Sequence, residues 1–248
     1  MKRSAVFLAA EWRYLTMLNF EVDSVLLERY LPSGTQLDSW CGRTFISVVG
    51  FRFVRTRVLG FPIPHHRHFD EVNLRFYVTR DASRGVRRGV VFIKEIVPRR
   101  AIAAVARRVY NENYIALPMR HTIDLAQTGE RGGEVSYAWR LQSRWNSLSA
   151  EVEGPPTIPQ EESEESFIAE HYWGYSMRKD GSTLEYEVEH PPWRVWRARS
   201  ALLDCDVAQL YGAEFEPFLG SVPSSAFVAE GSPIKVSWGR TLGTSHAV

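Results

Sequence analysis

One stretch of the chain, residues 68–121, constrains the fold most, because a strand with one polar face precedes a strand that is apolar on both faces. Within 70–78 the even positions are apolar, and the odd positions are polar: Glu71, Asn73, Arg75 and Tyr77. Side chains alternate along a strand, so this polar row faces either solvent or the lumen of a closed sheet. The run VVFIKEIV at 90–97 predicts a neighbour buried on both sides, which favours the lumen.

Similar alternation recurs along most of the sequence and predicts a mainly β protein. Strands are expected at 11–22, 37–58 (as a hairpin), 69–80, 86–97, 119–127, 133–142, 175–190 (a hairpin), 190–200 and 224–240 (a hairpin). Short helices are expected at 24–31, 99–110, 163–173 and 206–211. So many strands leave exposed edges unless the sheet closes, so we expect an α+β fold built on a closed or strongly curved antiparallel barrel.

Residues 1–248 are expected to form a single domain. The segment 154–166 is rich in proline and glutamate, as surface connections are, but no shift in composition marks a boundary there. We therefore interpret 154–166 as a surface excursion, and 128–133 as the connection between two strands.

Charge and cysteine content exclude several partners. The net charge is +1, so no overall field recruits nucleic acid or an anionic membrane. No apolar run approaches the roughly 20 residues of a membrane helix, and the apolar part of the N-terminus is too short for a secretory signal. Cys41 and Cys205 form no disulfide or metal pattern. A cytoplasmic location is expected, with neither nucleic acid nor membrane as partner.

Local motifs indicate no cofactor. The sequence contains no glycine-rich phosphate loop and no GxSxG elbow. His65, His66, His68 and Asp70 are ligand types, but no distant partner set accompanies them, so we predict no metal site.

Lys94 lies in the apolar run at 90–97. A lysine in such a place extends its amine to solvent, pairs with a carboxylate, or has a lowered pKa that makes it a nucleophile or base. The alternation does not say which side of the strand meets the lumen.

Most of the chain resembles the YqjF-like family, a domain of unknown function. The segments that carry the resemblance are EWRYLTMLNFEVD, VVGFRFVRTRVLGFPIPHHRHFDEVNLRFYV, GVVFIKEIVPRRAIAAVARRVYNENYIALPM and EHYWGYSMRKDGSTLEYEVEHPPWRVW. The family lends no established activity.

The first half is more distantly similar to acetoacetate decarboxylase. Arg13, ten residues before Asp23, and Glu71 at the entry to a strand resemble positions of that enzyme, and Leu117-Pro118-Met119 stands where it has Tyr-Pro-Lys. This resemblance implies a β-cone with a central cavity and a pairing of Arg13 with Glu71 at its floor. Met119 cannot form a Schiff base, so the resemblance does not extend to the decarboxylase mechanism.

Two functions fit these patterns. In the first, the cavity binds a small carboxylate or carbonyl compound through Arg13, Glu71, Arg75, Tyr77 and Met119. Glu71 then acts as acid or base, and Lys94 as a nucleophile if it enters the same cavity. In the second, the protein is a non-catalytic ligand sensor or structural module. The sequence leaves open whether a reaction occurs, and exposed strand edges are compatible with a homo-oligomer.

Overall fold

The computed structural model describes residues 5–83, 85–125 and 132–242. Its strands are β1 Val6–Val22, β2 Gln36–Leu37, β3 Thr44–Val58, β4 Phe61–Pro62, β5 Phe69–Ala82, β6 Gly85–Val97, β7 Tyr114–Ala116, β8 Met119–Asp124, β9 Gly133–Leu141, β10 Arg144–Val152, β11 Trp173–Met177, β12 Thr183–Glu189, β13 Val195–Asp204, β14 Ser225–Ser237 and β15 Arg240–Leu242. Its helices are α1 Ser24–Glu28, α2 Arg100–Tyr110, α3 Glu164–Ala169, α4 Val207–Leu210, η1 Ala213–Phe215 and α5 Glu216–Leu219. The prediction of a mainly β fold with a few short helices is confirmed.

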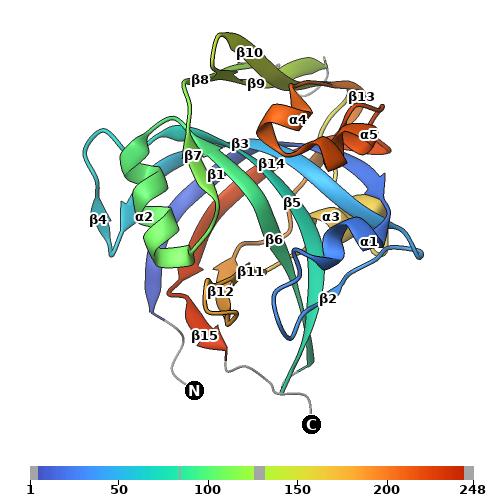
Figure 1. Cartoon of the computed structure of the whole chain (residues 1–248). Coiled ribbons are helices and arrows are strands. Elements are labelled where there is room, and N and C mark those ends of the chain that lie inside the picture. The colour runs from blue at the N-terminus through green and yellow to red at the C-terminus, as the bar shows by residue number, and fades with distance from the viewer. Residues whose placement is uncertain (1–4, 84, 126–131, 243–248) are drawn as a thin grey trace.

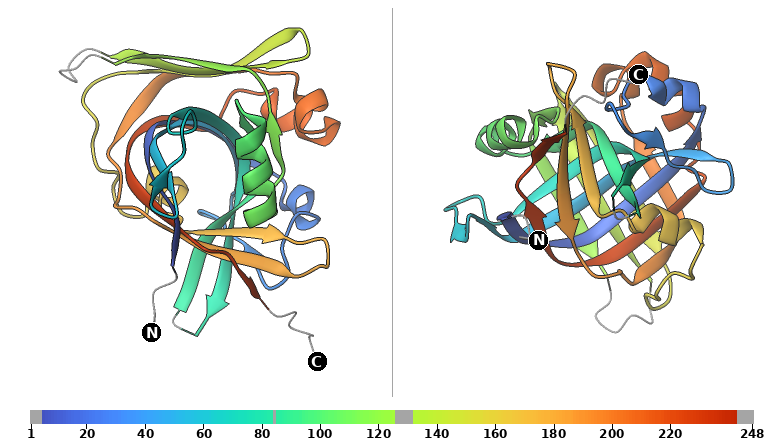
Figure 2. Two further views of the ribbon diagram at one scale, coloured as in Figure 1. Left: turned by 90° about the vertical axis from the view of Figure 1, so that its left-hand side faces the viewer. Right: turned by 90° about the horizontal axis from the view of Figure 1, so that it is seen from below.

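Seven strands close into a ring in the order β12, β11, β6, β5, β3, β1 and β14, and β14 pairs back with β12. Figure 2 shows this curled sheet with α2 beside it. The ring is mixed rather than wholly antiparallel, because β6 pairs in parallel with β11 and with β7. The β11–β12 hairpin is joined to its neighbours in the ring by short pairings: two residue pairs link β11 to β6, and two link β12 to β14.

A second layer continues from β14 through β13, β10, β9 and β8, and lies above the ring in Figure 1. Between the layers is an outer core formed by the outward side chains of β1, β3 and β5, the inward side chains of β9 and β10, and residues of α4, η1 and α5. This packing is tight at Gly50, where an added Cβ would lie 2.6 Å from Cδ2 of Tyr137. The ring interior holds a separate cluster that includes Phe7, Met17 and Phe51.

Several predicted elements need correction. Residues 224–240 do not form a hairpin. β14 is instead one strand, with Gly231 at a φ of +78° where an added Cβ would meet the carbonyl of Trp12 at 2.0 Å. A bend that brings two backbones so close requires glycine. The residues that suggested a hairpin turn within 224–240 form this bend in a continuous strand instead. β10, η1 and α5 were not predicted, and α3 is shorter than expected. Of the connection predicted at 128–133, residues 128–131 lie outside the described residues.

Candidate functional site

The polar row of β5 faces the interior of the ring. Glu71, Asn73, Arg75 and Tyr77 are 3%, 1%, 9% and 1% exposed, and the first three line a cavity there. The apolar face of β5 packs in the outer core. The expectation that this row faces a lumen therefore agrees with the structure.

A β-bulge in β6 decides which of two neighbouring ionisable residues enters the cavity. Lys94 pairs with Leu74 but Phe92 pairs with Arg75, so Ile93 is an extra residue on β6. The bulge shifts the alternation by one, as bulges do. Glu95 therefore lines the cavity. Lys94 lies on the outer face, where its Nζ donates to the carbonyl of Leu210 and burial lowers its pKa.

A second bulge turns Arg13 away from the interior. Arg13 pairs with Arg52 and Thr16 with Gly50, so β1 has one residue more than β3, and Tyr14 there has a φ of 55°. Trp12 and Leu15 line the cavity, whereas Arg13 lies outside. The guanidinium of Arg13 donates to the carboxylate of Glu11 at 3.0 Å through Nε, and a third of the Arg13 side chain is exposed. The predicted pairing of Arg13 with Glu71 is not found.

Neither Met119 nor Tyr77 lines the cavity: Tyr77 packs in the ring interior, and Met119 packs in the outer core. Met119 begins β8, pairs with Trp139 and packs in the outer core. The hydroxyl of Tyr77 is 2.6 Å from Oγ of Ser47, and its ring is 4.6 Å from that of His171. Of the six residues predicted for the site, Glu71 and Arg75 line the cavity.

The cavity has a volume of about 220 Å³ and mostly apolar walls. Aromatic and aliphatic side chains of β1, β3, β6, α2 and β12 form most of its lining: Phe7, Trp12, Leu15, Phe51, Phe53, Phe92, Ile102, Val105 and Val188. Its polar part is small and confined to a few buried groups. A mostly apolar hollow with a few converging polar groups is typical of small-molecule sites.

Three carboxyl groups meet at one side of this cavity: Glu71 from β5, Glu95 from β6, and Glu112 from the segment after α2. Burial raises the pKa of Glu71 to about 7 and that of Glu112 to about 8. Burial, together with the charges of Glu112 and Glu71, raises the pKa of Glu95. Tyr114 donates to Glu71 at 3.2 Å, and Tyr186 donates to Glu112. We refer to Glu71, Glu95 and Glu112 as the carboxyl cluster.

Arg75 is the buried cation of the cavity. Its guanidinium lies 5.6 Å from the ring centroid of Tyr77, and its Nη2 is 3.7 Å from the sulfur of Met17. Within the part of the chain that the structure describes, its Nε has no hydrogen-bond partner, and no carboxylate lies within ion-pair distance of it. Buried guanidinium groups are ordinarily paired, so this arrangement is unusual.

Three histidines also line the cavity: His66, His171 and His190. Burial lowers the pKa of His171 to about 4, although Nε2 lies 3.4 Å from Oδ2 of Asp38. His190 stacks on Trp193 with ring centroids 4.1 Å apart, and burial lowers its pKa. Neither Glu112 nor these histidines carried a periodic signal, because each lies in a loop.

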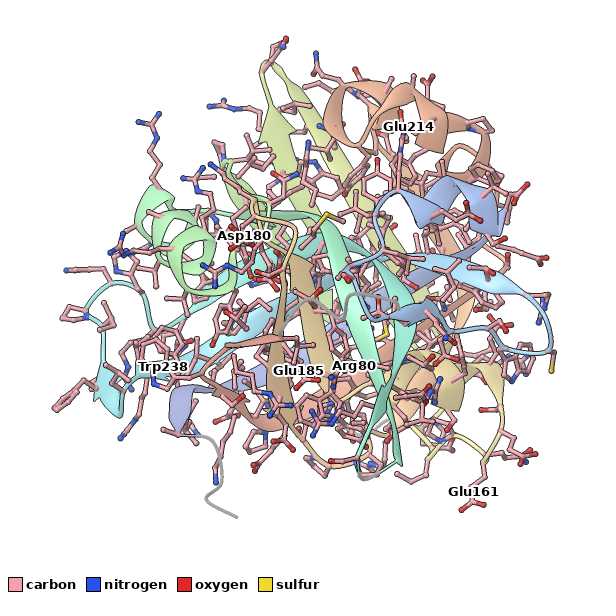
Figure 3. All side chains as sticks on the ribbon, turned by 60° about the horizontal axis from the view of Figure 1, so that its bottom comes forward. Arg80, Glu161, Asp180, Glu185, Glu214 and Trp238 are labelled. Atoms are coloured by element: carbon pink, nitrogen blue, oxygen red, sulfur yellow. The ribbon has the colours of Figure 1, made fainter. Side chains whose placement is uncertain are left out.

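A second charged cluster lies outside the cavity lining. Glu185 of β12 is fully buried and pairs with Arg80, Arg87 and Arg240. Figure 3 shows Glu185 and Arg80 side by side. Burial alone would raise the pKa of Glu185, but the hydrogen bonds from Arg87 and Arg240 hold it below the ordinary value. This network joins β12 to the ends of β5, β6 and β15.

Among residues 5–83, 85–125 and 132–242, no group of three His, Cys, Asp or Glu side chains is arranged to hold a metal ion. No helix of that same part is long and apolar enough to cross a membrane.

A family model matches residues 9–233 of the chain. That family is DUF2071, described as "Uncharacterized conserved protein (COG2071)". The chain belongs to this family. It is also 25% identical over 218 residues to the "Uncharacterized protein YqjF" of Bacillus subtilis (strain 168), and the match covers 84% of each chain.

Solved structures with acetoacetate-decarboxylase-like folds share the architecture. The enduracididine biosynthesis enzyme MppR, complexed with pyruvate, matches with a TM-score of 0.70 at 14% identity, over 98% of this chain and 93% of that one. Acetoacetate decarboxylase from Legionella pneumophila matches with a TM-score of 0.64 at 12% identity, over 100% and 92%. At these identities the likeness establishes the fold alone.

Proposed function

We propose that the cavity binds a small organic carboxylate through Arg75, and that Glu71 exchanges a proton with a carbon next to a carbonyl group of that ligand. One observation carries the proposal. Arg75 presents a guanidinium, nine-tenths buried, to an apolar cavity without a carboxylate partner among the described side chains. A guanidinium stays charged at any physiological pH, so an anion from outside is its natural partner.

Glu71 suits the proton-transfer role because a pKa of about 7 lets the same group accept and donate near neutral pH. Its carboxylate would take a proton from the carbon next to the carbonyl, leaving an enolate, and would return a proton to the same carbon. No oxidant or second reactant is needed. The structure of MppR with pyruvate makes a short oxo acid the first ligand to test.

This chemistry needs no lysine. Lys94 lies on the outer face of β6, and Lys179 and Lys235 are exposed. No lysine of the described residues lines the cavity. We therefore propose that an imine mechanism is absent; Met119, which stands where the decarboxylase sequence has its Schiff-base lysine, packs in the outer core.

Pyruvate in deuterium oxide provides the test. Proton NMR should show its methyl signal fall as deuterium enters, at a rate proportional to protein concentration. Glu71→Gln should abolish this exchange and retain pyruvate binding, whereas Arg75→Met should abolish binding. Arg13→Met serves as the matched arginine control and should exchange like the unchanged protein. Absence of binding by the unchanged protein to a panel of short carboxylates would overturn the proposal.

Binding without exchange would favour the second candidate, a ligand sensor that performs no reaction. The observation behind that reading is that His171, buried and with a lowered pKa, lines the same cavity as Arg75 and Glu71, and a neutral imidazole there also suits recognition alone.

Self-association is proposed through β8, which pairs with β9 on one side and is the last strand of its layer among the described residues. Light scattering with size-exclusion chromatography measures the oligomeric state, and a monomer at all concentrations would contradict it.

A further inference from the structure

We infer that the ligand is a zwitterion whose amino group binds between Glu95 and Glu112, at the opposite end of the molecule from the carboxylate held by Arg75. This inference rests on the proposed function, because it takes Arg75 as the carboxylate-binding group. It narrows the ligand from any small carboxylate to one that carries a basic nitrogen several bonds away.

The hydrogen bonds around the carboxyl cluster leave acceptors without partners. Asn73 donates through Nδ2 to Glu71 at 3.2 Å, Tyr114 donates to Glu71, and Tyr186 donates to Glu112. The single hydroxyl protons of Tyr114 and Tyr186 are thereby used. Oε2 of Glu95 and Oδ1 of Asn73 are buried without a partner among the described residues. When Glu95 and Glu112 are ionised, a group that completes this cluster must bring donors, and an ammonium group brings three.

The charges around the cluster point the same way. No described lysine, arginine or histidine forms an ion pair with any of its three members. Buried carboxylates without a counter-ion are costly, and they avoid the cost by holding protons. A ligand ammonium supplies the missing positive charge and lets Glu95 and Glu112 ionise.

Among the described residues, the carboxyl cluster has hydrogen-bond acceptors without partners, whereas Arg75 has a donor without a partner. Four positions along the β5 row from Glu71, Nε of Arg75 is a donor without a partner among the described residues. Glu71 and Arg75 are four residues apart, so their Cα atoms are separated by about 13 Å along the strand. Asn73 lies between them and also lines the cavity. Amino and carboxylate groups on one carbon are too close together to meet both ends.

Aromatic rings near the cluster also suit a cation. The rings of Tyr110 and Tyr186 lie 4.5 Å apart, and both residues line the cavity beside Glu112. Ring faces attract an ammonium group, most strongly where water is excluded.

The test compares three probes of equal chain length: hexanoate, 6-aminohexanoate and 2-aminohexanoate. Hexanoate offers only a carboxylate, and the two amino acids differ only in where the amine is attached. Affinities are measured at pH 7.5 by titration calorimetry or by chemical-shift titration. We expect 6-aminohexanoate to bind about tenfold more tightly than hexanoate or more, as a charge-assisted hydrogen bond provides. The 2-amino isomer should gain nothing.

Glu95→Gln and Glu112→Gln provide the matched variants, since each removes one charge with almost no change of shape. Either change should bring the ratio of the two affinities to about one. Glu187→Gln, on β12 outside the cavity lining, is the control and should keep the ratio.

The outcomes separate this inference from the proposed function. If hexanoate binds and 6-aminohexanoate binds no better, the inference of a zwitterionic ligand is wrong and the proposed function stands. If the gain survives both glutamine variants, the amine lies elsewhere and the inference is again wrong. If none of the three probes binds, and short oxo acids do not bind either, both proposals fall together.

Discussion

The two faces of β5 are equally buried and have opposite character. On the outer face Val72, Leu74 and Phe76 are 0% exposed and pack in the outer core between the ring and the second layer. On the inner face Glu71 and Arg75 are 3% and 9% exposed, yet they line an open cavity without an ion-pair partner among the described residues. Burial fraction therefore does not distinguish a packed core from a site. The distinction lies in whether the neighbours fill the space and satisfy the polar atoms.

The largest expected effect comes from deleting volume on the outer face. Leu74→Ala should lower the free energy of unfolding by about 2–5 kcal/mol, because the smaller side chain would leave a void in the close-packed outer core. Leu15→Ala is the matched change on the inner side, where Leu15 already borders the cavity. Leu15→Ala should lower the free energy of unfolding by clearly less than Leu74→Ala does, since fewer packing contacts are lost. Urea denaturation measures both, and equal losses would show that the two sides are packed alike.

The pH dependence of stability comes next and reports on the inner face. A carboxyl group whose pKa is raised on folding binds more protons in the folded state than in the unfolded state. Its contribution to stability is therefore full below the unfolded-state pKa and is lost as the pH rises to the folded-state pKa. For Glu71 the window runs from 4.5 to about 7, which corresponds to about 3 kcal/mol. Stability should therefore decline from pH 5 to pH 8.

Glu71→Gln should flatten this decline, and the exposed Glu151→Gln should leave it as it is. Chemical denaturation at a series of pH values makes the comparison. A profile of the unchanged protein that rises between pH 5 and pH 8 would contradict the assignment of the carboxyl cluster as predominantly protonated.

A smaller effect is expected from Lys94→Met. The change removes the hydrogen bond to the carbonyl of Leu210 and should cost about 1 kcal/mol. Because Lys94 lies on the outer face, binding of carboxylates should not change. Borohydride treatment with an oxo acid, followed by mass mapping, should find no adduct on Lys94, and an adduct there would mean that the bulge in β6 is misplaced.

The smallest effect belongs to Arg13. Its ion pair with Glu11 is partly exposed, and such pairs contribute about 0–1 kcal/mol. Arg13→Met should leave both stability and carboxylate affinity nearly unchanged, whereas Arg75→Met should abolish binding. Thermal shift with a saturating carboxylate distinguishes the two arginines, and equal losses of binding would contradict the inside and outside placement.

Sequence alone predicted the closed sheet and the inward polar row, because both follow from alternation over long, uninterrupted strands. The resemblance to acetoacetate decarboxylase placed Arg13 in the site, and the sequence left the side of Lys94 open; in the structure both lie outside the cavity for the same physical reason. Each lies next to a bulge, at Tyr14 and Ile93, and one extra residue reverses the alternation beyond it. The apolar run at 90–97 did hold an inward ionisable residue, but that residue is Glu95.

The loop-borne members of the site could not be predicted at all. Glu112 follows α2 after a left-handed turn at Asn111, and His171 precedes β11. Their positions in the cavity depend on how distant strands pair, and no local pattern reports that pairing.

The short joins of the β11–β12 hairpin have a mechanical consequence. Two backbone residue pairs connect it to the ring on either side, in addition to the ion pairs of Glu185 with Arg80 and Arg87. Its backbone pairing to the ring is therefore expected to open at a lower free energy than the long β1, β3 and β5 pairings. Movement of the hairpin away from its neighbours would separate Tyr186 from Glu112 and open the cavity to solvent. We expect the backbone amides of the hairpin to exchange with deuterium sooner than those of β1 and β3. Opening of the hairpin is then the expected route by which a ligand enters the cavity.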